Sequence, residues 1–434
     1  MSRYQSFFGI PIENWGNRKL KYICSINPEV LSADTPADYE FEYVDIGSVE
    51  YGKGIIEKKL VYFEDSPSRA RRKVKYGDVI VSTVRTYLKA IASITDENKD
   101  IIVSTGFAVV HPEKINKEFM AYLLTSKPFV ETIVSESVGV SYPAISPTKL
   151  ASIKIPFPEK EIEQIAIANF LDRKTKDIQI QIEKIKGLIE LLQEEKEVLI
   201  INAVTRGLDT NVQMKDSGID WIGEIPTHWE VTRIKWTKKY GANSFSDGDW
   251  IESEHITDEG VRLIQTGNIG IGEYIEQGGR YISEDSFDEL KCKELYAGDV
   301  LICRLASPVG RSCLCPDMKC KMITSVDVCF LRPSDTWDNR YIVYSLSNPK
   351  YLDYVDVIAR GSTRQRISRT QVGDFNILSP PLQEQIDIAN YLDDRLSYIA
   401  SVISKNEDLI KKLTEYQEAL ITAAVTGKII VRGE

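Results

Sequence analysis

Apolar residues recur with helical spacing in two long stretches of the chain. Between residues 178 and 203 they are separated alternately by four and three residues, and residues 399–424 repeat this spacing. Such spacing places apolar side chains along one side of a helix, where they need a partner helix. Polar residues at Lys196, Asn406 and Gln417 interrupt the pattern and would help to fix the register. The expected contact positions are Ile178, Ile182, Ile185, Ile189, Leu192, Leu199, Ile399, Ile403, Ile410, Leu413 and Leu420.

These helical stretches belong to an internal repeat. Residues 163–172 return as residues 384–393, and residues 203–205 return as residues 424–426, with an offset of 221 in both cases. One amphipathic helix alone would be interpreted as an ordinary core helix. A seam that recurs in fixed register instead predicts two long helices that pair with each other. Gly207 and Gly427 follow the two stretches and suit the carboxyl ends of helices.

Strand-like patterns precede each predicted helix in the same order. A Gly-Asp turn leads into a buried apolar run in both halves, and a short helix is expected around residues 118–124 and 340–346. The paired strand segments are residues 41–47 with 263–269, 76–81 with 297–302, 104–112 with 325–333, and 153–156 with 375–378.

The repeat therefore predicts an α+β protein in the order domain, helix, domain, helix. Both domains are expected to be mixed α/β, and a polar connector is expected at residues 209–220. Two homologous units in one chain can adopt a pseudo-two-fold arrangement, in which the long helices form an antiparallel coiled coil. The predicted boundaries are 1–157 and 209–379 for the domains, and 158–208 and 380–434 for the helical regions.

The length of the helical seam suggests a ligand. A helix from residue 178 to residue 203 would span about 38 Å at 1.5 Å per residue. One turn of B-DNA measures about 34 Å, so two domains separated by such a helix could contact the same face of one duplex.

Composition limits the other possibilities. The chain has 434 residues and a net charge of −10, which is unusual for a protein that binds nucleic acid. Residues 1–150 are neutral, with 19 basic and 19 acidic residues, and residues 211–379 carry 20 basic and 25 acidic residues. A DNA-binding surface would thus have to be a local basic patch. We find no run that would span a membrane and no secretory signal.

The seven cysteines indicate reduced thiols and a cytoplasmic protein, because an odd number in a large chain does not fit a disulfide framework. Cys313, Cys315 and Cys320 lie near Cys303 and Cys329 in the sequence. Zinc is conceivable there, but the spacing matches no regular Cys-x-x-Cys pair, and we expect no metal.

Catalytic motifs are missing from the sequence. We find no phosphate-binding glycine loop and no His-Glu-x-x-His, and the three histidines fit no triad pattern. Residues 348–351, Asn-Pro-Lys-Tyr, differ from the Asn-Pro-Pro-Tyr loop of adenine methyltransferases by a Lys in place of the second Pro. We interpret them as a turn at a helix end and expect no catalytic residue and no cofactor bound by this chain.

Basic and polar residues are concentrated in the predicted loops. Lys and Arg neutralise phosphates, and Arg, Gln and Asn can also hydrogen-bond to base edges. A solvated surface is the alternative interpretation of any one of these clusters, but the late loop differs between otherwise matching halves. There Tyr-Pro-Ala at residues 142–144 becomes Arg-Gln-Arg at residues 364–366. The candidate DNA-binding residues are Arg69, Arg71, Arg72, Lys73, Arg85, Tyr87, Lys89, Tyr142, Gln265, Asn268, Arg304, Arg311, Arg364, Gln365, Arg366 and Arg369.

Residues 216–229 strongly resemble the opening of a target recognition domain in the specificity subunits of type I restriction-modification systems. Residues 380–385 and 424–429 look like the start and end of the long conserved helix of that family. The first copy departs slightly, because its Pro-to-Gln segment is two residues longer and Arg206 precedes Gly207. The resemblance covers essentially the whole chain.

The resemblance implies a non-catalytic DNA-recognition subunit. Each target recognition domain would bind one half of a split, asymmetric site in double-stranded DNA, and the helices would set the spacer. In this family the helices also dock two adenine methyltransferase subunits, which use S-adenosylmethionine. A motor-endonuclease subunit joins them for restriction, so that the system methylates host DNA and defends against foreign DNA.

Two other classes of function remain open. One is a scaffold whose duplicated domains bind protein; loss of DNA binding at raised salt, expected for phosphate contacts, would argue against it. The other is an enzyme with an unrecognised site, which activity of the purified chain alone would reveal.

Overall fold

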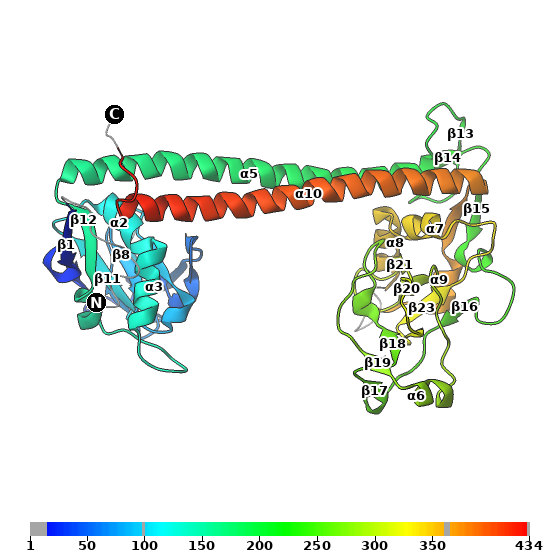
Figure 1. Cartoon of the computed structure of the whole chain (residues 1–434), viewed down its shortest axis with the longest axis horizontal. Coiled ribbons are helices and arrows are strands. Elements are labelled where there is room, and N and C mark those ends of the chain that lie inside the picture. The colour runs from blue at the N-terminus through cyan, green and yellow to red at the C-terminus, as the bar shows by residue number, and fades with distance from the viewer. Residues whose placement is uncertain (1–14, 98–99, 360–364, 432–434) are drawn as a thin grey trace. The chain divides into compact units, whose positions relative to one another are not determined.

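The computed structural model describes residues 15–97, 100–359 and 365–431, and the chain divides into two compact units (Figure 1). The first unit contains Met1–Lys186 and Glu407–Glu434, and the second contains Gly187–Asn406. Two long helices, α5 (Glu161–Arg206) and α10 (Leu382–Val425), contribute one part to each unit. The prediction of two long paired helices is confirmed.

The first unit contains two four-stranded sheets. One has the strand order β2-β11-β8-β9 and the other β6-β3-β10-β7, and β1 pairs with β12 and β4 with β5. The strands are β1 (Trp15–Lys19), β2 (Cys24–Ile26), β3 (Glu40–Val44), β4 (Val49–Glu50), β5 (Gly54–Ile55), β6 (Lys59–Tyr62), β7 (Ala70–Lys73), β8 (Val79–Ser82), β9 (Ile91–Ser93), β10 (Ile101–Ser104), β11 (Phe107–Pro112) and β12 (Lys154–Pro158). The helices before α5 are α2 (Lys117–Thr125), α3 (Lys127–Glu136) and α4 (Pro147–Ala151).

The second unit has a related arrangement of two four-stranded sheets. Its sheets have the orders β16-β23-β20-β21 and β17-β19-β18-β22, and β15 pairs with β24 and β13 with β14. The strands are β13 (Met214–Asp216), β14 (Glu224–Pro226), β15 (Glu230–Arg233), β16 (Phe245–Asp247), β17 (Ile256–Thr257), β18 (Val261–Ile264), β19 (Tyr281–Ile282), β20 (Val300–Cys303), β21 (Ser312–Leu314), β22 (Met322–Thr324), β23 (Val328–Leu331) and β24 (Asn376–Ser379). The helices are α6 (Glu284–Glu289), α7 (Asn339–Leu346), α8 (Pro349–Ala359) and α9 (Arg369–Asp374).

The pairing pattern confirms the internal repeat. In each unit the strand after the Gly-Asp turn, β8 or β20, lies antiparallel to β11 or β23. Each unit also has one parallel pair, β3 with β10 and β18 with β22. The predicted short helices are α2 and α7. Further helices follow them that the sequence analysis did not predict, and Asn348 lies at the junction of α7 and α8, where its Oδ1 accepts the N–H of Lys350 at 3.0 Å.

The long helices form part of the core of each unit. In the first unit Ile167 and Leu171 of α5 share a buried cluster with Ala424 and Val425 of α10. In the second unit Ile200, Ala203 and Val204 of α5 cluster with Ile388 and Leu392 of α10. Low-numbered residues of one helix thus meet high-numbered residues of the other, so the helices pack antiparallel.

None of the predicted apolar seam positions is exposed. Ile178, Ile182 and Ile399 are buried, and the other predicted apolar contact residues are half-buried. Lys196 departs from the prediction, because its side chain is exposed, as the long stem of Lys allows. Asn406 is half-buried, and its Nδ2 donates to the carbonyl of Val402 at 2.9 Å within its own helix.

Both long helices end at the glycines that the sequence indicates. The φ angles of Gly207 and Gly427 are 74° and 70°, in the left-handed region that glycine adopts without strain. A Cβ at Gly207 would also lie 3.1 Å from the ring of Trp229. The helix end is therefore packed against the start of the second domain.

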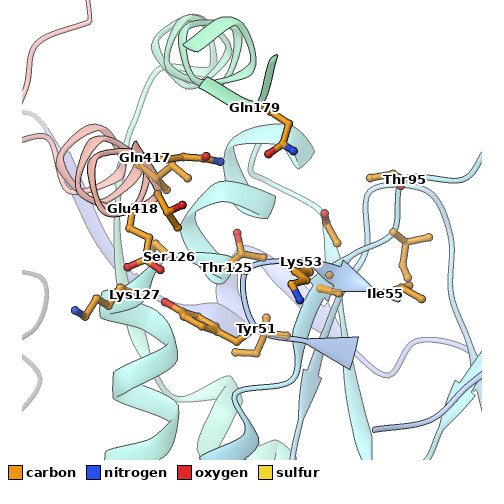
Figure 2. A pocket seen from close by; sticks show the side chains of 18 of the residues that line it. Tyr51, Lys53, Ile55, Thr95, Thr125, Ser126, Lys127, Gln179, Gln417 and Glu418 are labelled. Atoms are coloured by element: carbon orange, nitrogen blue, oxygen red, sulfur yellow. The ribbon is translucent and has the colours of Figure 1, made fainter. Parts of the chain in front are cut away.

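An open cavity of about 810 Å³ separates part of the first domain from the helices of the same unit. It lies between the β4–β5 hairpin, the α2–α3 junction and the two long helices. Figure 2 shows Gln179 and Gln417 extending from α5 and α10 toward this space. Next to the cavity the first domain and the helices share a buried core. At the cavity itself they are separated.

Candidate nucleic-acid interface

Two loops lie side by side in the first unit. One follows β8 and contains a short 3-10 helix, Thr86–Leu88; the other is the late loop between α3 and α4. Val84 and Ala144 form an antiparallel bridge between them. The guanidinium of Arg85 lies 5.4 Å from the centre of the Tyr142 ring. Two candidate residues from distant parts of the sequence thus come together.

The second unit pairs the corresponding loops. Leu305, after β20, forms an antiparallel bridge with Arg366 in the late loop. The N–H of Ala306 donates to the carbonyl of Gln365 at 3.3 Å. Ala144 and Arg366 therefore occupy matching places, as the alignment of the two late loops predicts. Arg364 lies outside the described residues.

The loop after the Gly-Asp strand holds unusual backbone conformations in both units. Arg85 and Lys89 have φ angles of 51° and 54°, and Ala306 has a φ of 68°. A left-handed conformation costs a non-glycine residue roughly 1–3 kcal/mol and is concentrated at functional sites. Arg85 and Ala306 occupy equivalent positions of the repeat. The strained backbone conformation therefore occurs at the same place in both domains, where the surrounding hydrogen bonds maintain it.

The candidate residues of the first loop pair are accessible. Arg85 and Tyr87 are exposed, and Tyr142 is 68% exposed. Lys89 is half-buried, with its Nζ 5.3 Å from the centre of the Tyr51 ring. These side chains present cationic and aromatic groups together, which suits phosphates and bases.

Arg69 is connected to these loops through the backbone. The N–H of Thr105 donates to the carbonyl of Arg69, and the next residue, Gly106, accepts from the N–H of Thr83, both at 2.8 Å. The carbonyl of Thr83 accepts in turn from Ile145 of the late loop at 2.9 Å. Arg69 therefore lies beside the paired loops.

The sequence analysis predicted a loop at Arg71, Arg72 and Lys73. In the structure these residues form part of strand β7 instead. This strand is at an edge of its four-stranded sheet, and its outer side is bridged at Arg72 to Val30, so the three side chains are half-buried. The Arg71 guanidinium lies 4.9 Å from the centre of the Phe63 ring. At about 3.3 Å per residue, Lys73 is roughly 13 Å along the strand from Arg69.

Asn268 and Arg304 have structural roles in the second unit. Asn268 is buried; its Oδ1 accepts the N–H of Gln265, and its Nδ2 donates to two carbonyls. Arg304 is 6% exposed, donates to the carbonyl of Val326 and lies 3.3 Å from a carboxylate oxygen of Asp247. Both side chains are buried, so neither presents an edge to a base at the surface. We therefore remove both from the candidate surface.

Arg311 and Arg369 also hold the fold together. Arg311 donates to the carbonyls of Thr266 and Ile269 at 3.0 and 2.7 Å and to those of Ala306 and Pro308 at 2.7 and 2.9 Å. It thereby joins the Gln265 loop to the loop after β20. Arg369 bonds to Asp247 and to the carbonyl of Phe245 at 3.2 and 3.1 Å.

Three candidate residues in the second unit keep accessible surface at the loops. Gln265 and Gln365 are half-buried, and Arg366 is exposed. A guanidinium nitrogen of Arg366 lies 3.1 Å from a carboxylate oxygen of Asp327. An ion pair this exposed is worth about 0–1 kcal/mol, so it can be exchanged for a contact with DNA.

Sequence analysis missed several exposed apolar side chains at these loops. Val138 and Val140 lie exposed on either side of Gly139 in the late loop of the first unit. In the second unit Trp250 is 71% exposed and follows Asp249, which is bridged to Ser325. An apolar residue in an otherwise polar or glycine-containing segment is the signal that could have revealed them.

Each Gly-Asp turn contains a buried carboxylate at the opposite end of the strand from these loops. Burial raises the pKa of Asp78 and of Asp299. Asp78 lies 2.6 Å from Nδ1 of His111, and Asp299 lies 3.1 Å from Nε of Arg332. Each also accepts the backbone N–H three residues earlier, at 2.8 and 2.9 Å. Their role is to hold the turn.

The described residues include no group of three or more His, Cys, Asp or Glu arranged to hold a metal. Cys303, Cys313, Cys315 and Cys329 are buried, and Cys320 is exposed. In the same part of the chain, no helix is both long and apolar enough to cross a membrane.

Comparisons with known proteins agree with this architecture. A family model described as the type I restriction modification DNA specificity domain matches residues 12–193. The chain is 24% identical to the type I restriction enzyme MjaVIII specificity subunit of Methanocaldococcus jannaschii, over 95% of this chain and 91% of that protein. The putative MjaX specificity subunit of the same organism is 26% identical, with coverage of 97% and 95%.

Solved structures share the fold. A chain from a study of complex assembly and conformational transition of the type I R-M system matches with a TM-score of 0.74 and 24% identity, covering 97% of this chain and 100% of that one. The HsdS subunit from Thermoanaerobacter tengcongensis matches with a TM-score of 0.57 and 23% identity, over 96% and 98%. Residues 12–193 thus match the type I restriction modification DNA specificity domain, and the whole chain, with its duplicated domains and long helices, shares the fold of these specificity-subunit structures.

Proposed function

We propose that this chain selects the DNA sequence on which a type I complex acts, with each domain binding one half of a split, asymmetric site. The observation that supports this most directly is the recurrence of the paired loops on two copies of one scaffold. The bridges from Val84 to Ala144 and from Leu305 to Arg366 join the same elements, while the loop sequences differ. Two domains that recognise different DNA sequences require a shared framework with different loop sequences.

The chemistry of the loops suits both base edges and phosphates. Gln365 and Arg366 would contact bases in the second half-site, because Arg pairs with guanine and Gln with adenine through two hydrogen bonds. In the first domain Arg85, Tyr87 and Tyr142 would bind the other half-site. Arg69 and Lys89 would neutralise phosphates. A local patch of this kind is compatible with the net charge of −10.

We assign the docking of two adenine methyltransferase subunits to the long helices. In the second unit Leu188, Leu191 and Val198 of α5 are exposed, and their spacing places them on one side of the helix. Tyr391 and Tyr398 are also exposed, seven residues apart on α10. Exposed apolar side chains in register are typical of a surface that partner helices cover.

The proposal assigns no catalytic step to this chain. S-adenosylmethionine would be bound by the methyltransferase subunits, and DNA cleavage would belong to a motor-endonuclease subunit. The complex would act on DNA in the cytoplasm. The 46 residues of α5 correspond to about 69 Å of helix, and we propose that this length sets the unspecified spacer.

A domain exchange tests the proposal. Residues 1–150 are replaced by those of another family member, and the methyltransferase complex is assayed on duplexes altered in one half-site at a time. We expect only one half-site preference to change, because each domain reads alone. A change in both halves would contradict independent reading, and a chimera with the original preference would exclude residues 1–150 from recognition.

A further inference from the structure

Each long helix begins with a buried glutamine at a repeat-equivalent position. Gln164 is 3% exposed and Gln385 is 1% exposed. An apolar residue would fill such a position without the cost of burying an amide, which is high unless every hydrogen bond is formed. The glutamine therefore has to be explained by its contacts.

Gln164 joins three segments of the first unit. Its Oε1 accepts the N–H of Asn116 at 2.7 Å, and its Nε2 donates to the carbonyl of Pro158 at 2.7 Å. Asn116 is the N-cap residue of α2, and Pro158 ends β12. One side chain thus ties the first turn of α5 to a helix and a strand of the domain.

Gln385 makes the same connections in the second unit. Its Oε1 accepts the N–H of Asp338, the N-cap residue of α7, at 3.0 Å. Its Nε2 donates to the carbonyls of Pro380 and Thr336 at 2.9 and 3.3 Å. The segments joined are the equivalents of those in the first unit.

A second polar contact lies eight residues further along each helix. The hydroxyl of Tyr122 in α2 donates to Asp172 at 2.7 Å, and that of Tyr344 in α7 donates to Asp393. In the second unit Arg340 adds an ion pair of 2.6 Å with Asp393. Eight residues correspond to about 12 Å along the helix. Two directional contacts this far apart oppose both sliding and tilting of the domain on its helix.

We infer that Gln164 and Gln385 are positioning residues that hold each domain in one orientation on its long helix. Apolar packing around Leu171 and Leu392 is non-directional and keeps the domain attached without fixing its angle. The hydrogen bonds of the amide supply the missing direction. Given the proposed function, the amides thereby fix how the reading loops are presented to DNA.

The second unit allows a test that does not depend on DNA. Spin labels are placed on Cys320, which is exposed, and on an exposed helix residue through Ser397→Cys, with Cys292→Ser to avoid a third label. Pulsed electron resonance then measures the distance between the labels. We expect Gln385→Met, which keeps the volume and removes the hydrogen bonds, to broaden the distance distribution.

Gln383→Met is the matched control, because Gln383 is exposed two residues away and its side-chain hydrogen bond, to Asp387 at 3.0 Å, stays within its own helix. It should leave the distribution narrow. A narrow distribution in folded Gln385→Met would overturn the inference. If Gln385→Met does not fold, Tyr344→Phe removes the neighbouring contact alone, and an unchanged distribution in that variant would overturn the two-contact arrangement.

Binding by the methyltransferase complex tests the consequence for DNA. We expect Gln385→Met to reduce the preference for the correct spacer over a spacer one base pair longer by roughly tenfold, equivalent to about 1.4 kcal/mol. Affinity for the correct site should change much less. An equal loss on all duplexes would indicate a merely structural role. If the parent complex shows no sequence preference, the proposed function fails while the distance measurement still decides the inference.

Discussion

The arginines of the second domain divide into two kinds by the partners of their guanidinium groups. Arg304, Arg311 and Arg369 donate to backbone carbonyls, and Arg304 and Arg369 also pair with Asp247, so these three arginines hold the loops in place. Arg366 is exposed in the late loop and pairs only at the surface with Asp327. Residue type is the same in all four, and only the fold distinguishes them.

Arg366→Ala should therefore weaken recognition of one half-site. Loss of a bidentate contact with a base costs about 1–3 kcal/mol of discrimination. The unfolding midpoint should change little, because the ion pair with Asp327 is exposed. Competition binding with duplexes altered in either half measures the effect. Lys319→Ala, which removes an equal charge at another exposed position, is the control, and an identical loss in both variants would refute a specific contact.

The cysteines give a second prediction at this scale. Burial raises the pKa of the Cys24, Cys313 and Cys329 thiols to about 12, so little thiolate is present near neutral pH. Cys320 is exposed and should react first with iodoacetamide at pH 8. Mass spectrometry of partly labelled native protein identifies the order. Equal labelling of all sites before unfolding would contradict the buried cores described for the two domains.

At the scale of elements, sequence analysis detected the patterns that extend over many residues or in which apolar and polar positions differ sharply. The seams of α5 and α10 and the buried runs of β8 and β20 were predictable, because burial of one helix side or of a whole strand leaves a clear signal. Strand β7 was mistaken for a loop, since its Ala-Arg-Arg-Lys sequence has the composition of one. An edge strand that carries mostly polar residues shows no clear difference between apolar and polar positions.

The candidate site was predictable only in part, for a related reason. Matching the two halves aligned Ala144 with Arg366, and the bridges to Val84 and Leu305 confirm that these positions correspond. Nothing in the local sequence separates Arg304 from Arg366. Their difference arises from long-range contacts with β16 and with the turn that contains Val326 and Asp327.

Neighbouring positions on α10 should separate helix packing from docking. Ile399 is buried in the seam and Tyr398 is exposed. Ile399→Ala should lower the free energy of unfolding by about 2–5 kcal/mol, as for other buried aliphatic truncations. Tyr398→Ala should leave the thermal unfolding midpoint nearly unchanged but reduce co-purification with the methyltransferase subunit. The reverse pattern would contradict the assignment of the two faces.

At the scale of the whole molecule, the chain carries a duplicated domain and a duplicated long helix, and the proposed function gives each copy one half of a split DNA site. The two units share one four-stranded sheet order, one parallel strand pair and the paired loops, and each long helix contributes to both units. Divergence of one late loop can then alter one half of a target without disturbing the other. The repeat thus supports a division of labour in which specificity lies here and chemistry lies in partner subunits.

The most direct test is a modified-base map of host DNA with and without this gene. Our account predicts that deletion abolishes adenine methylation at one split, asymmetric motif and that complementation restores it. The Arg366→Ala gene should restore methylation less completely. An unchanged map, in cells that express the chain and its methyltransferase partner, would contradict the claim that this subunit selects the methylated sequence.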